Sequence, residues 1–584
     1  MCGIVGAFAP NSLDLVAQAL PKLEHRGPDS RGMTDLGPCA LGMVRLAIQD
    51  PLPRADQPMT RGDLTVVFNG EIYNFRELRG QLSALGHSFT TTGDTEVVLC
   101  ALLEWGMAAL DRFHGMFAIA WWSAASATLH VARDRCGIKP LYWRSVGASG
   151  VEFASEVRAL SRPESQISMT AVDQFLRFGS PISETIYSDV LELMPGNVLA
   201  VSEDRLSISS WIPVRGLGEG LANGAQPIEA FESAIASHLL ADRKVAVFLS
   251  GGFDSALVAR GIRDAGGSPL AITLDTGGNA DEVAGAVRTA SHYGLEHHVV
   301  RVASDDLPTL AADFMAAQDQ PTIDGFNTYL VSKAAVSEGC AVALSGLGGD
   351  EVLGGYGYYS SALSHRMIQH VPKSLMSKTA GLLEGVTGKP ASRLVALAGA
   401  VTPVERFVAS REVFSADETS QLTGTSSPAD LGLKSDHSQS VFRQLQTLDF
   451  DTYLRATLLR DSDVFSMWHG LEIRVPMLDC AFVRSAGEHP EELSKRSLAE
   501  AAGDPYLMSI ANQRKLGFVL PWDTWLPHLI AANVGDLSSA DPWHGLVDPD
   551  LGCKFVERGG IDPQRTWTLL VLATWLSLHT QGVS

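Results

Sequence analysis

The sequence predicts two domains of different architecture: a layered α+β domain in the first 200 residues, and an α/β domain with a doubly wound parallel sheet and a helical C-terminal part after it. Three observations predict this. Short strands cluster in the first part, single strands alternate with helices after residue 240, and a glycine-rich stretch without periodicity at 215–224 separates the two patterns. The length of 584 residues, several times the ~150 residues of a common domain, agrees with more than one core. We therefore expect domains at 2–200 and 229–584 and a linker at 201–228.

The first domain combines strand runs with a helical segment. A β-branched run ends in Asn69-Gly70, a dipeptide typical of turns. The apolar runs 116–122 and 128–131 are joined by small residues, which is typical of a hairpin. Residues 95–110 carry apolar side chains at helical spacing. Strand clusters flanked by helices predict layers in which helices cover the sheets.

The second domain begins with a buried-strand pattern at 244–249, and a helical pattern at 255–265 follows it. Further strands are predicted at 269–274 and 341–344, and the chain from about residue 360 is mainly helical. Strand, helix and strand at this spacing predict parallel βαβ units.

Composition excludes several function classes. The formal charge of −21, from 45 basic and 66 acidic residues, repels nucleic acids and anionic membranes, so we expect neither as a partner. The seven cysteines form no CxxC pair, which argues against a zinc site or a disulfide scaffold and favours a reduced, cytoplasmic setting. The longest apolar stretch, 567–578, is about half of the ~20 residues that span a bilayer. We expect it to form a buried C-terminal helix.

The strongest single signal is a loop directly after the strand predicted at 244–249. It reads Ser250-Gly251-Gly252-Phe253-Asp254-Ser255 and opens a helix. Glycines let the backbone approach phosphate oxygens, and the helix N-terminus supplies N–H donors. Asp254 can hold a divalent metal ion that bridges phosphates. No lysine follows the glycines, which excludes a Walker-type loop. The loop resembles the pyrophosphate loop of ATP pyrophosphatases, and the alternative is a capped glycine turn.

A second loop of this kind follows the strand predicted at 341–344. It reads Ser345-Gly346-Leu347-Gly348-Gly349-Asp350-Glu351, and Asp350 is a second candidate metal ligand. Because the carboxyl ends of parallel strands meet at one edge of a sheet, we expect the two loops to face each other there. The alternative is a turn with exposed carboxylates.

The N-terminus offers a candidate nucleophile. Removal of the initiator methionine would leave Cys2 with a thiol and a free amine on one carbon, which is the N-terminal-nucleophile arrangement. Three further features suit an amino-acid amide substrate. Arg45 could clamp a carboxylate, Asp94 could bind an ammonium group, and Asn69 with the Gly70 N–H could form an oxyanion hole.

These features belong to a wider resemblance. The motifs that resemble a class II glutamine amidotransferase domain, which has an αββα Ntn-hydrolase-type fold, lie at 1–6, 25–29, 68–74, 133–142 and 153–156. Together with both phosphate loops, the whole chain resembles glutamine-hydrolysing asparagine synthetases, a family with an ATP-pyrophosphatase synthetase domain. The C-terminal motifs of that family are matched at 461–463, 466–467, 471–479 and 515–518 and at Pro521. The resemblance runs from residue 2 to about 525.

The resemblance implies a reaction at two sites. At the first, the Cys2 thiolate attacks the side-chain amide of glutamine, and ammonia leaves. At the second, ATP and Mg²⁺ activate a carboxylate as an acyl-adenylate, which releases pyrophosphate. Ammonia travels between the sites inside the protein and displaces AMP. The family is also compatible with a homodimer.

The resemblance assigns residues to each role. The implied catalytic residues are Cys2, Asn69, Gly70 and Lys515, and the implied glutamine-binding residues are Arg45, Asn69, Gly70, Glu71 and Asp94. The implied ATP-binding residues are Leu249, Ser250, Gly251, Gly252, Asp254, Ser255, Leu274, Ser345 and Gly346, with Asp254 and Asp350 as metal ligands.

The carboxylate acceptor remains open between two candidates. The simplest is aspartate, which would become asparagine. The alternative is another carboxylate of a secondary-metabolite or polysaccharide pathway, because Leu347 stands where the family commonly has an acidic residue and Trp468 where it often has a small one. The segment 318–327 also differs from an aspartate-binding stretch. A third hypothesis of another class, an inactive nucleotide-binding scaffold, is disfavoured by the intact set of Cys2, Asp254, Asp350 and Lys515.

Overall fold

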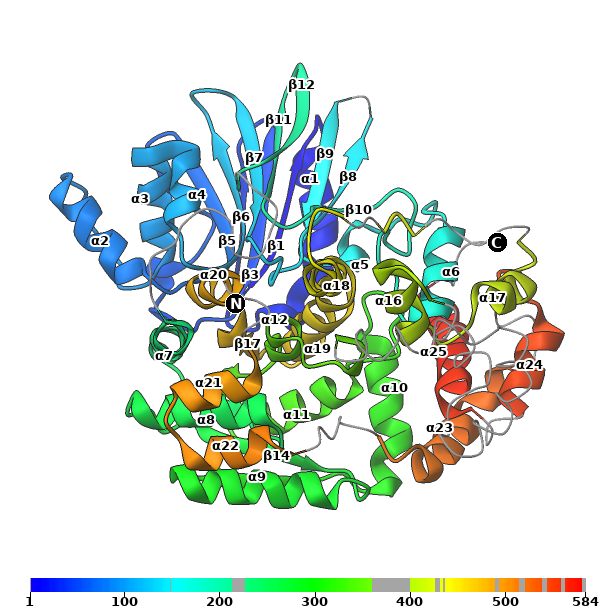
Figure 1. Ribbon diagram of the computed structural model, residues 1–584. Helices are drawn as coiled ribbons and strands as arrows, with labels where there is room; N and C mark the ends of the chain where they lie inside the picture. Colours follow the sequence, from blue (N-terminus) through cyan, green and yellow to red (C-terminus); the bar gives the residue numbers. More distant parts are fainter. Residues whose placement is uncertain are drawn as a thin grey trace.

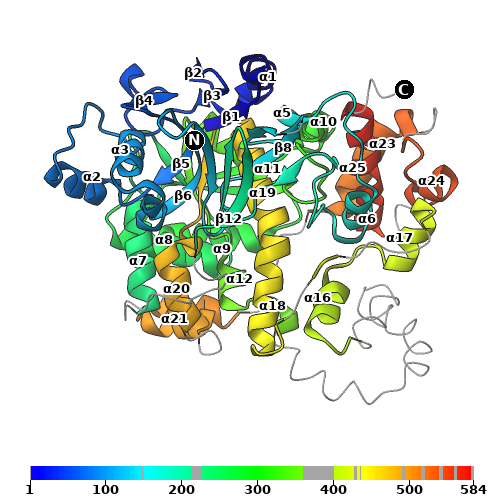
Figure 2. The same cartoon turned by 90° about the horizontal axis from the view of Figure 1, so that it is seen from above.

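The computed structural model describes residues 2–147, 149–212, 226–359, 400–425, 431–433, 436–488, 493–513, 520–537, 543–557 and 562–579. Two antiparallel sheets form the N-terminal part, and a parallel sheet with its helices lies against one end of them (Figure 1). The C-terminal helices pack beside both parts (Figure 2). The predicted fold class, α+β followed by α/β with a helical C-terminal part, is confirmed.

The first domain contains two six-stranded antiparallel sheets. The first sheet has the order β10 (Leu191–Glu192), β8 (Tyr142–Val146), β9 (Gly150–Ala154), β1 (Cys2–Phe8), β3 (Cys39–Arg45) and β2 (Ser30–Asp35). The second has the order β12 (Arg205–Ser210), β11 (Asn197–Ser202), β7 (Thr128–Arg133), β6 (Gly115–Ser123), β5 (Leu64–Ile72) and β4 (Met59–Arg61).

The two sheets enclose an apolar core, and helices cover their outer faces. Ile4 and Leu41 of the first sheet pack with Val67, Ala118 and Val131 of the second in one buried cluster. The outer face of the second sheet packs against α2 (Phe75–Ala84) and α3 (Thr95–Trp105). The outer face of the first packs against α1 (Ser12–Ala19), α5 (Val157–Leu160) and α6 (Met169–Phe178). This is the predicted αββα layering.

Two details of the first domain differ from the sequence prediction. Asn69 and Gly70 do not form a turn, because β5 continues through them and pairs with β6 as far as Ile72. The second sheet also continues beyond the predicted domain end at residue 200, since β12 pairs with β11 up to Ser210. Both differences arise because cross-strand pairing overrides the local turn and linker composition.

The second domain contains a five-stranded parallel sheet. Its order is β15 (His297–Arg301), β14 (Leu270–Asp275), β13 (Val245–Phe248), β16 (Val342–Leu344) and β17 (Glu472–Arg474). The helices between and around these strands are α7 (Pro227–His238), α8 (Phe253–Asp264), α9 (Ala280–Tyr293), α10 (Leu307–Ala317), α11 (Phe326–Ser337) and α12 (Gly349–Leu353). The chain proceeds from β13 toward β15 on one side and reaches β16 on the other. The direction of winding therefore reverses between β13 and β16, where open α/β sheets bind their ligands.

The remaining described chain is helical except for β17. Its helices are α16 (Pro403–Arg411), α17 (Ala416–Thr423), α18 (Val441–Asp449), a π-helix at Phe450–Leu459, α19 (Arg460–Trp468), α20 (Cys480–Glu488), α21 (Lys495–Ala501), α22 (Pro505–Ala511), α23 (Trp522–Leu537), α24 (Pro549–Glu557) and α25 (Pro563–His579). The apolar stretch at 567–578 lies in α25 and is largely buried against the rest of the fold, as predicted. Across the described part of the chain, we find no helix with the length and apolar character that a bilayer crossing requires.

Buried ion pairs join the two domains. Arg26 donates to Asp463 at 2.6 Å, and Lys139 approaches the other oxygen of the same carboxylate at 3.4 Å. Arg474 donates to Glu71 at 3.0 Å. Breaking a buried ion pair leaves an uncompensated charge and costs about 3–5 kcal/mol, so these contacts fix how the two domains are placed.

Candidate active sites

The candidate nucleophile Cys2 opens β1 inside the first domain. Its Cα is paired with that of Arg45, the last residue of β3. The main-chain nitrogen of Cys2 donates to Asn69 Oδ1 at 3.0 Å. Burial raises the pKa of the Cys2 thiol, while the Leu46 N–H and the charge of Arg45 act in the opposite direction. The thiol therefore needs a nearby base to become a nucleophile, and the amine of its own residue can be that base once the preceding methionine is removed.

Asn69 offers an unused hydrogen-bond donor beside Cys2. The side chain is fully buried, its oxygen accepts from Cys2, and its Nδ2 has no partner among the described residues. A buried donor without a partner costs about 1–3 kcal/mol, which a substrate oxygen would recover. The next residue must be glycine, because a Cβ at Gly70 would lie 2.1 Å from the carbonyl oxygen of Met116. This arrangement suits the predicted oxyanion hole.

We expect the substitution Asn69→Ala to lower kcat for glutamine hydrolysis by about 10²–10³-fold, because one oxyanion donor is lost. KM for glutamine should change little. Steady-state glutamate formation measures both constants. Asn74→Ala is a matched control, since Asn74 instead bonds the main chain of Arg112 and His114. A fall in kcat of the same size in both variants would contradict the assignment.

Two buried carboxylates lie close to this donor. Asp94 directly precedes α3 and accepts from the Ile72 N–H at 3.0 Å. Glu71 follows Gly70 in β5 and accepts from Gln49 and Arg474. Burial raises the pKa of Asp94 to about 6, and burial together with the charge of Asp94 raises the pKa of Glu71. The pair gives the site the negative charge that would attract the ammonium group of an amino acid.

We expect KM for glutamine to rise as the pH falls through 6. Asp94 is ionised above its raised pKa of about 6 and loses its charge below it. One pH unit below that pKa, about nine tenths of the carboxyl groups are protonated, so KM should be about tenfold higher at pH 5 than at pH 8. Initial rates across this range measure the effect. In Asp94→Asn, KM should be high and should not change near pH 6; a persisting change there would contradict the role.

Arg45 lies at the predicted position, but its guanidinium is already engaged. It donates to the carbonyl oxygens of Gln49, Asp50 and Leu52 and to the Asp56 carboxylate at 2.8 Å. These bonds close the loop after β3 around the site. A substrate carboxylate would have to share this guanidinium with that loop.

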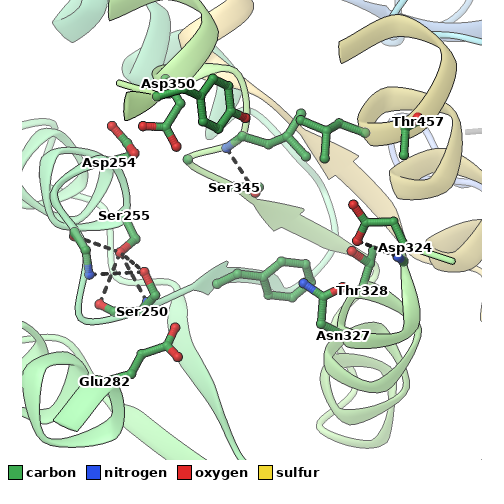
Figure 3. Close-up of a pocket in the computed structure, with 18 of the residues that line it drawn as sticks. Ser250, Asp254, Ser255, Glu282, Asp324, Asn327, Thr328, Ser345, Asp350 and Thr457 are labelled. Atoms are coloured by element: carbon green, nitrogen blue, oxygen red, sulfur yellow. Dashed lines mark hydrogen bonds between the residues drawn. The ribbon is translucent and has the colours of Figure 1, made fainter. Parts of the chain in front are cut away.

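The first phosphate loop follows β13 as predicted. Hydrogen bonds between its first and last residues close the loop. Ser250 Oγ lies 2.9 Å from Ser255 Oγ, and the Ser250 N–H donates to Ser255 Oγ at 3.1 Å (Figure 3). The Gly252 N–H also bonds Ser250 Oγ. The loop opens into α8, whose N-terminus points its N–H groups toward the cavity.

The second loop follows β16 and packs against the first. A Cβ at Gly346 would lie 2.9 Å from the main chain of Asp254, and a Cβ at Gly349 would lie 2.6 Å from its carboxylate. Glycine at these positions therefore allows the two loops to touch. They face each other where the winding of the sheet reverses, as the sequence predicts.

Lys495 connects the two candidate metal ligands. Its Nζ donates to Asp254 at 2.6 Å and to Asp350 at 2.7 Å. The two carboxylates, one from each loop, thus converge on a single positive charge. Mg²⁺ is commonly held by one or two carboxylates together with substrate phosphates, and this pair fits that pattern. The pKa of Lys495 is raised: burial lowers it, but the two carboxylates outweigh that effect.

A cavity of about 1240 Å³ contains the predicted synthetase site. It is lined by every predicted ATP-binding and metal-ligating residue: Leu249, Ser250, Gly251, Gly252, Asp254, Ser255, Leu274, Ser345, Gly346 and Asp350. The Leu249 N–H donates to the carbonyl oxygen of Ile272. For contact with the base of a nucleotide, Leu249 therefore retains only its carbonyl oxygen and its side chain. The predicted catalytic Lys515 lies outside the described residues, although Gln513 and Leu520 on either side of its segment line the cavity.

Part of the cavity wall is aromatic. The rings that line it belong to Phe178, Tyr356, Phe407, Tyr453, Trp522 and Trp567. Arg411 lies among them, with its guanidinium carbon 3.6 Å from the Tyr453 ring centre, and it also bonds Asp449 at 3.0 Å. Asp324 projects into the cavity from the loop before α11 (Figure 3) and accepts from Tyr453.

A small cavity of about 10 Å³ lies at the domain interface. Its lining combines both domains: Ile138, Lys139, Leu459, Ser462, Asp463, Ile473 and Val475. This volume is close to the minimum that holds one water-sized molecule.

Comparison with known proteins assigns each half of the chain to a protein family. Residues 1–212 match the family described as "Glutamine amidotransferase domain", and residues 228–577 match the family described as "Asparagine synthase". The second match covers more than half of the chain. The chain belongs to the asparagine synthase family. Members of this family are ligases that use ATP, and the two domains together carry out glutamine-dependent amidation.

Named relatives agree with this family. Asparagine synthetase (glutamine-hydrolyzing) 1 of Bacillus subtilis strain 168 is 29% identical over 631 residues, covering 100% of this chain and 97% of the relative. A putative asparagine synthetase of Mycobacterium tuberculosis strain H37Rv is 30% identical over 649 residues, covering 100% and 98%. Amidase chyE of Penicillium rubens is 29% identical over 385 residues, covering 60% and 55%.

Two residues of this asparagine synthase family member were missed by the sequence reasoning. Lys495 stands in no glycine-rich or paired-carboxylate motif, and 145 residues separate it from Asp350. Arg474 belongs to a recognised motif, but its partner Glu71 is 403 residues away in the other domain. Only the folded chain brings these charges together.

Proposed function

We propose that the protein hydrolyses glutamine at Cys2 and passes the ammonia to a carboxylate that ATP has activated as an acyl-adenylate. The observation that carries this proposal is the pairing of two sites in one chain. One holds a buried cysteine beside the unpartnered amide donor of Asn69, and the other holds two phosphate loops in contact.

At the glutamine site, the amine of Cys2 takes the proton of its own thiol, and the thiolate attacks the amide carbon of glutamine. Asn69 Nδ2 and the Gly70 N–H donate to the oxyanion that forms. Asp94 and Glu71 attract the substrate ammonium group. The Cys2 amine gives the proton to the departing ammonia, and water then hydrolyses the thioester, which releases glutamate and frees the thiol.

At the synthetase site, the N–H groups of the Ser250 loop and the Ser345 loop bind the phosphates of ATP, and Leu249 and Leu274 contact its base. Asp254 and Asp350 would hold Mg²⁺, which neutralises phosphate charge when bound. The acceptor carboxylate attacks the α-phosphorus, and pyrophosphate leaves. Lys515 would assist the later attack of ammonia on the acyl-adenylate, which releases AMP. The small interface cavity beside Lys139 and Asp463 supports a route for ammonia between the domains.

Two acceptors remain candidates. Aspartate is the simplest, in keeping with the names of the relatives. The aromatic wall around Tyr453 and the apolar side chain of Leu347 at the cavity favour a second candidate, a carboxylate with a larger apolar body. The cavity of about 1240 Å³ exceeds the ~300–1,000 Å³ of common ligand pockets, so it has room for such a body beside ATP.

One experiment tests the reaction and chooses between the acceptors. The protein is incubated with glutamine, MgATP and single carboxylic acids, including aspartate, and pyrophosphate and amide products are followed by mass. Pyrophosphate with aspartate supports the first candidate, and pyrophosphate only with another acid supports the second. Glutamine hydrolysis without pyrophosphate from any acid would contradict the synthetase proposal.

A further inference from the structure

Arg474 is in direct contact with both sites. It ends β17, the edge strand of the parallel sheet beside β16. Its carbonyl oxygen accepts from the N–H of Ser345, the first residue of the second phosphate loop, at 2.9 Å. The main chain of this residue therefore anchors the start of that loop.

The side chain of Arg474 crosses into the first domain. It is fully buried, and its Nη2 donates to the Glu71 carboxylate at 3.0 Å. Its Nη1 donates to the carbonyl oxygens of His238 and Leu240 at 2.8 and 2.7 Å, and its Nε donates to Glu472. Four hydrogen bonds fix the guanidinium, so it holds the Glu71 carboxylate in one place.

Glu71 depends on this cation for its charge. The charged groups that act on it are Asp94, Arg474, Glu472 and the N-terminal amine, with Gln49 bonding its second oxygen. Burial and the charges of Asp94 and Glu472 raise the pKa of Glu71, whereas the charge of Arg474 lowers it. Of the two cations, Arg474 has the larger effect and donates directly to the carboxylate, so removal of its charge favours the neutral form of Glu71.

We propose that Arg474 is a positioning residue that holds Glu71 for glutamine binding from the opposite domain and joins it to the Ser345 loop of the synthetase site. The inference rests on the proposed function, because it takes Glu71 to bind glutamine. The link runs from the Ser345 N–H through the main chain and side chain of Arg474 to Glu71, two residues from the oxyanion donor Asn69.

The variant Arg474→Met keeps an unbranched apolar side chain in place of the aliphatic stem and removes the guanidinium charge. We expect KM for glutamine to rise at least about tenfold, while kcat for glutamine hydrolysis stays within about threefold, because Cys2 and Asn69 are unchanged. Pyrophosphate release with ammonium chloride as the nitrogen source should also stay within about threefold, since the Arg474 carbonyl still bonds Ser345.

Arg455→Met is the matched control. Arg455 is also a buried arginine that crosses the domain interface, where it bonds Glu192 and the Ile182 carbonyl oxygen, away from the glutamine site. This variant should leave KM for glutamine within about twofold of the original value. Arg474→Lys, which retains the charge, should recover most of the affinity for glutamine.

Three results would overturn the proposal. They are an unchanged KM in folded Arg474→Met, an equal loss of glutamine hydrolysis and ammonia-dependent synthesis, and equal effects of Arg455→Met and Arg474→Met. If Arg474→Met does not fold, the double-mutant cycle of Arg474→Gln, which removes the charge but keeps an amide donor, with Glu71→Gln decides: additive effects on KM would contradict the link. Failure of the proposed function is distinct, because the unaltered protein would then not hydrolyse glutamine at all.

Discussion

Replacement Cys2→Ala should abolish glutamine hydrolysis and leave synthesis from ammonium salts intact. The thiol is the only nucleophile in the proposed first step, and its removal leaves Asn69 and the carboxylates without a group to form the thioester. We expect a fall in glutamate formation of about 10³-fold or more. The phosphate loops of the synthetase site lie in the other domain, so ammonia-dependent pyrophosphate release should stay within about twofold.

Both rates are measured on one preparation, with glutamate and pyrophosphate as the readouts. Cys39→Ala is a suitable control, because Cys39 is also buried but lies at the opposite end of the β1–β3 pair from Cys2. Loss of ammonia-dependent synthesis in a folded Cys2→Ala protein would contradict two separable sites. Retained glutamine hydrolysis would contradict Cys2 as the nucleophile.

For Asp350→Asn we expect the opposite result: the protein should lose pyrophosphate release and keep glutamine hydrolysis. This change keeps the shape of the side chain and removes one of the two carboxylates that converge on Lys495. Pyrophosphate release should fall by about 10²–10³-fold, because the charge of the proposed metal site is halved and Lys495 loses one ionic partner. Glutamine hydrolysis without acceptor should change by no more than about twofold.

Asp313→Asn provides the comparison for this variant, since Asp313 is an exposed residue of α10 whose carboxylate lies 3.9 Å from Lys333. A higher Mg²⁺ concentration should partly restore the rate of pyrophosphate release in Asp350→Asn and leave that rate unchanged in Asp313→Asn. Full pyrophosphate release by Asp350→Asn at low Mg²⁺ would show that the second loop does not act through this carboxylate.

The parts that sequence reasoning predicted are those with local signatures. The strand–loop–helix pattern around Ser250 and the glycine spacing around Gly346 each carry their own geometry, and the parallel sheet then places the two loops face to face. The same holds for the buried helix at 567–578, whose apolar character shows in the sequence alone.

The features that sequence reasoning missed depend on contacts between segments that are far apart in the chain. Asn69-Gly70 has the composition of a turn, but pairing with β6 keeps both residues in a strand and turns the Asn69 amide toward Cys2. The charges of Lys495 and Arg474 acquire their roles only through partners at Asp350 and Glu71, which no spacing along the chain reveals. Long-range charge pairing is a property of the fold and not of a motif.

The transfer of nitrogen from glutamine to an ATP-activated carboxylate is tested most directly by isotope labelling. The protein is incubated with MgATP, one carboxylic acid at a time and glutamine that carries ¹⁵N in its side-chain amide. The products are identified and quantified by mass spectrometry. We predict AMP, pyrophosphate and an amide that carries the ¹⁵N label, in equal amounts. Formation of ADP and phosphate, or of an amide without the label, would contradict the account.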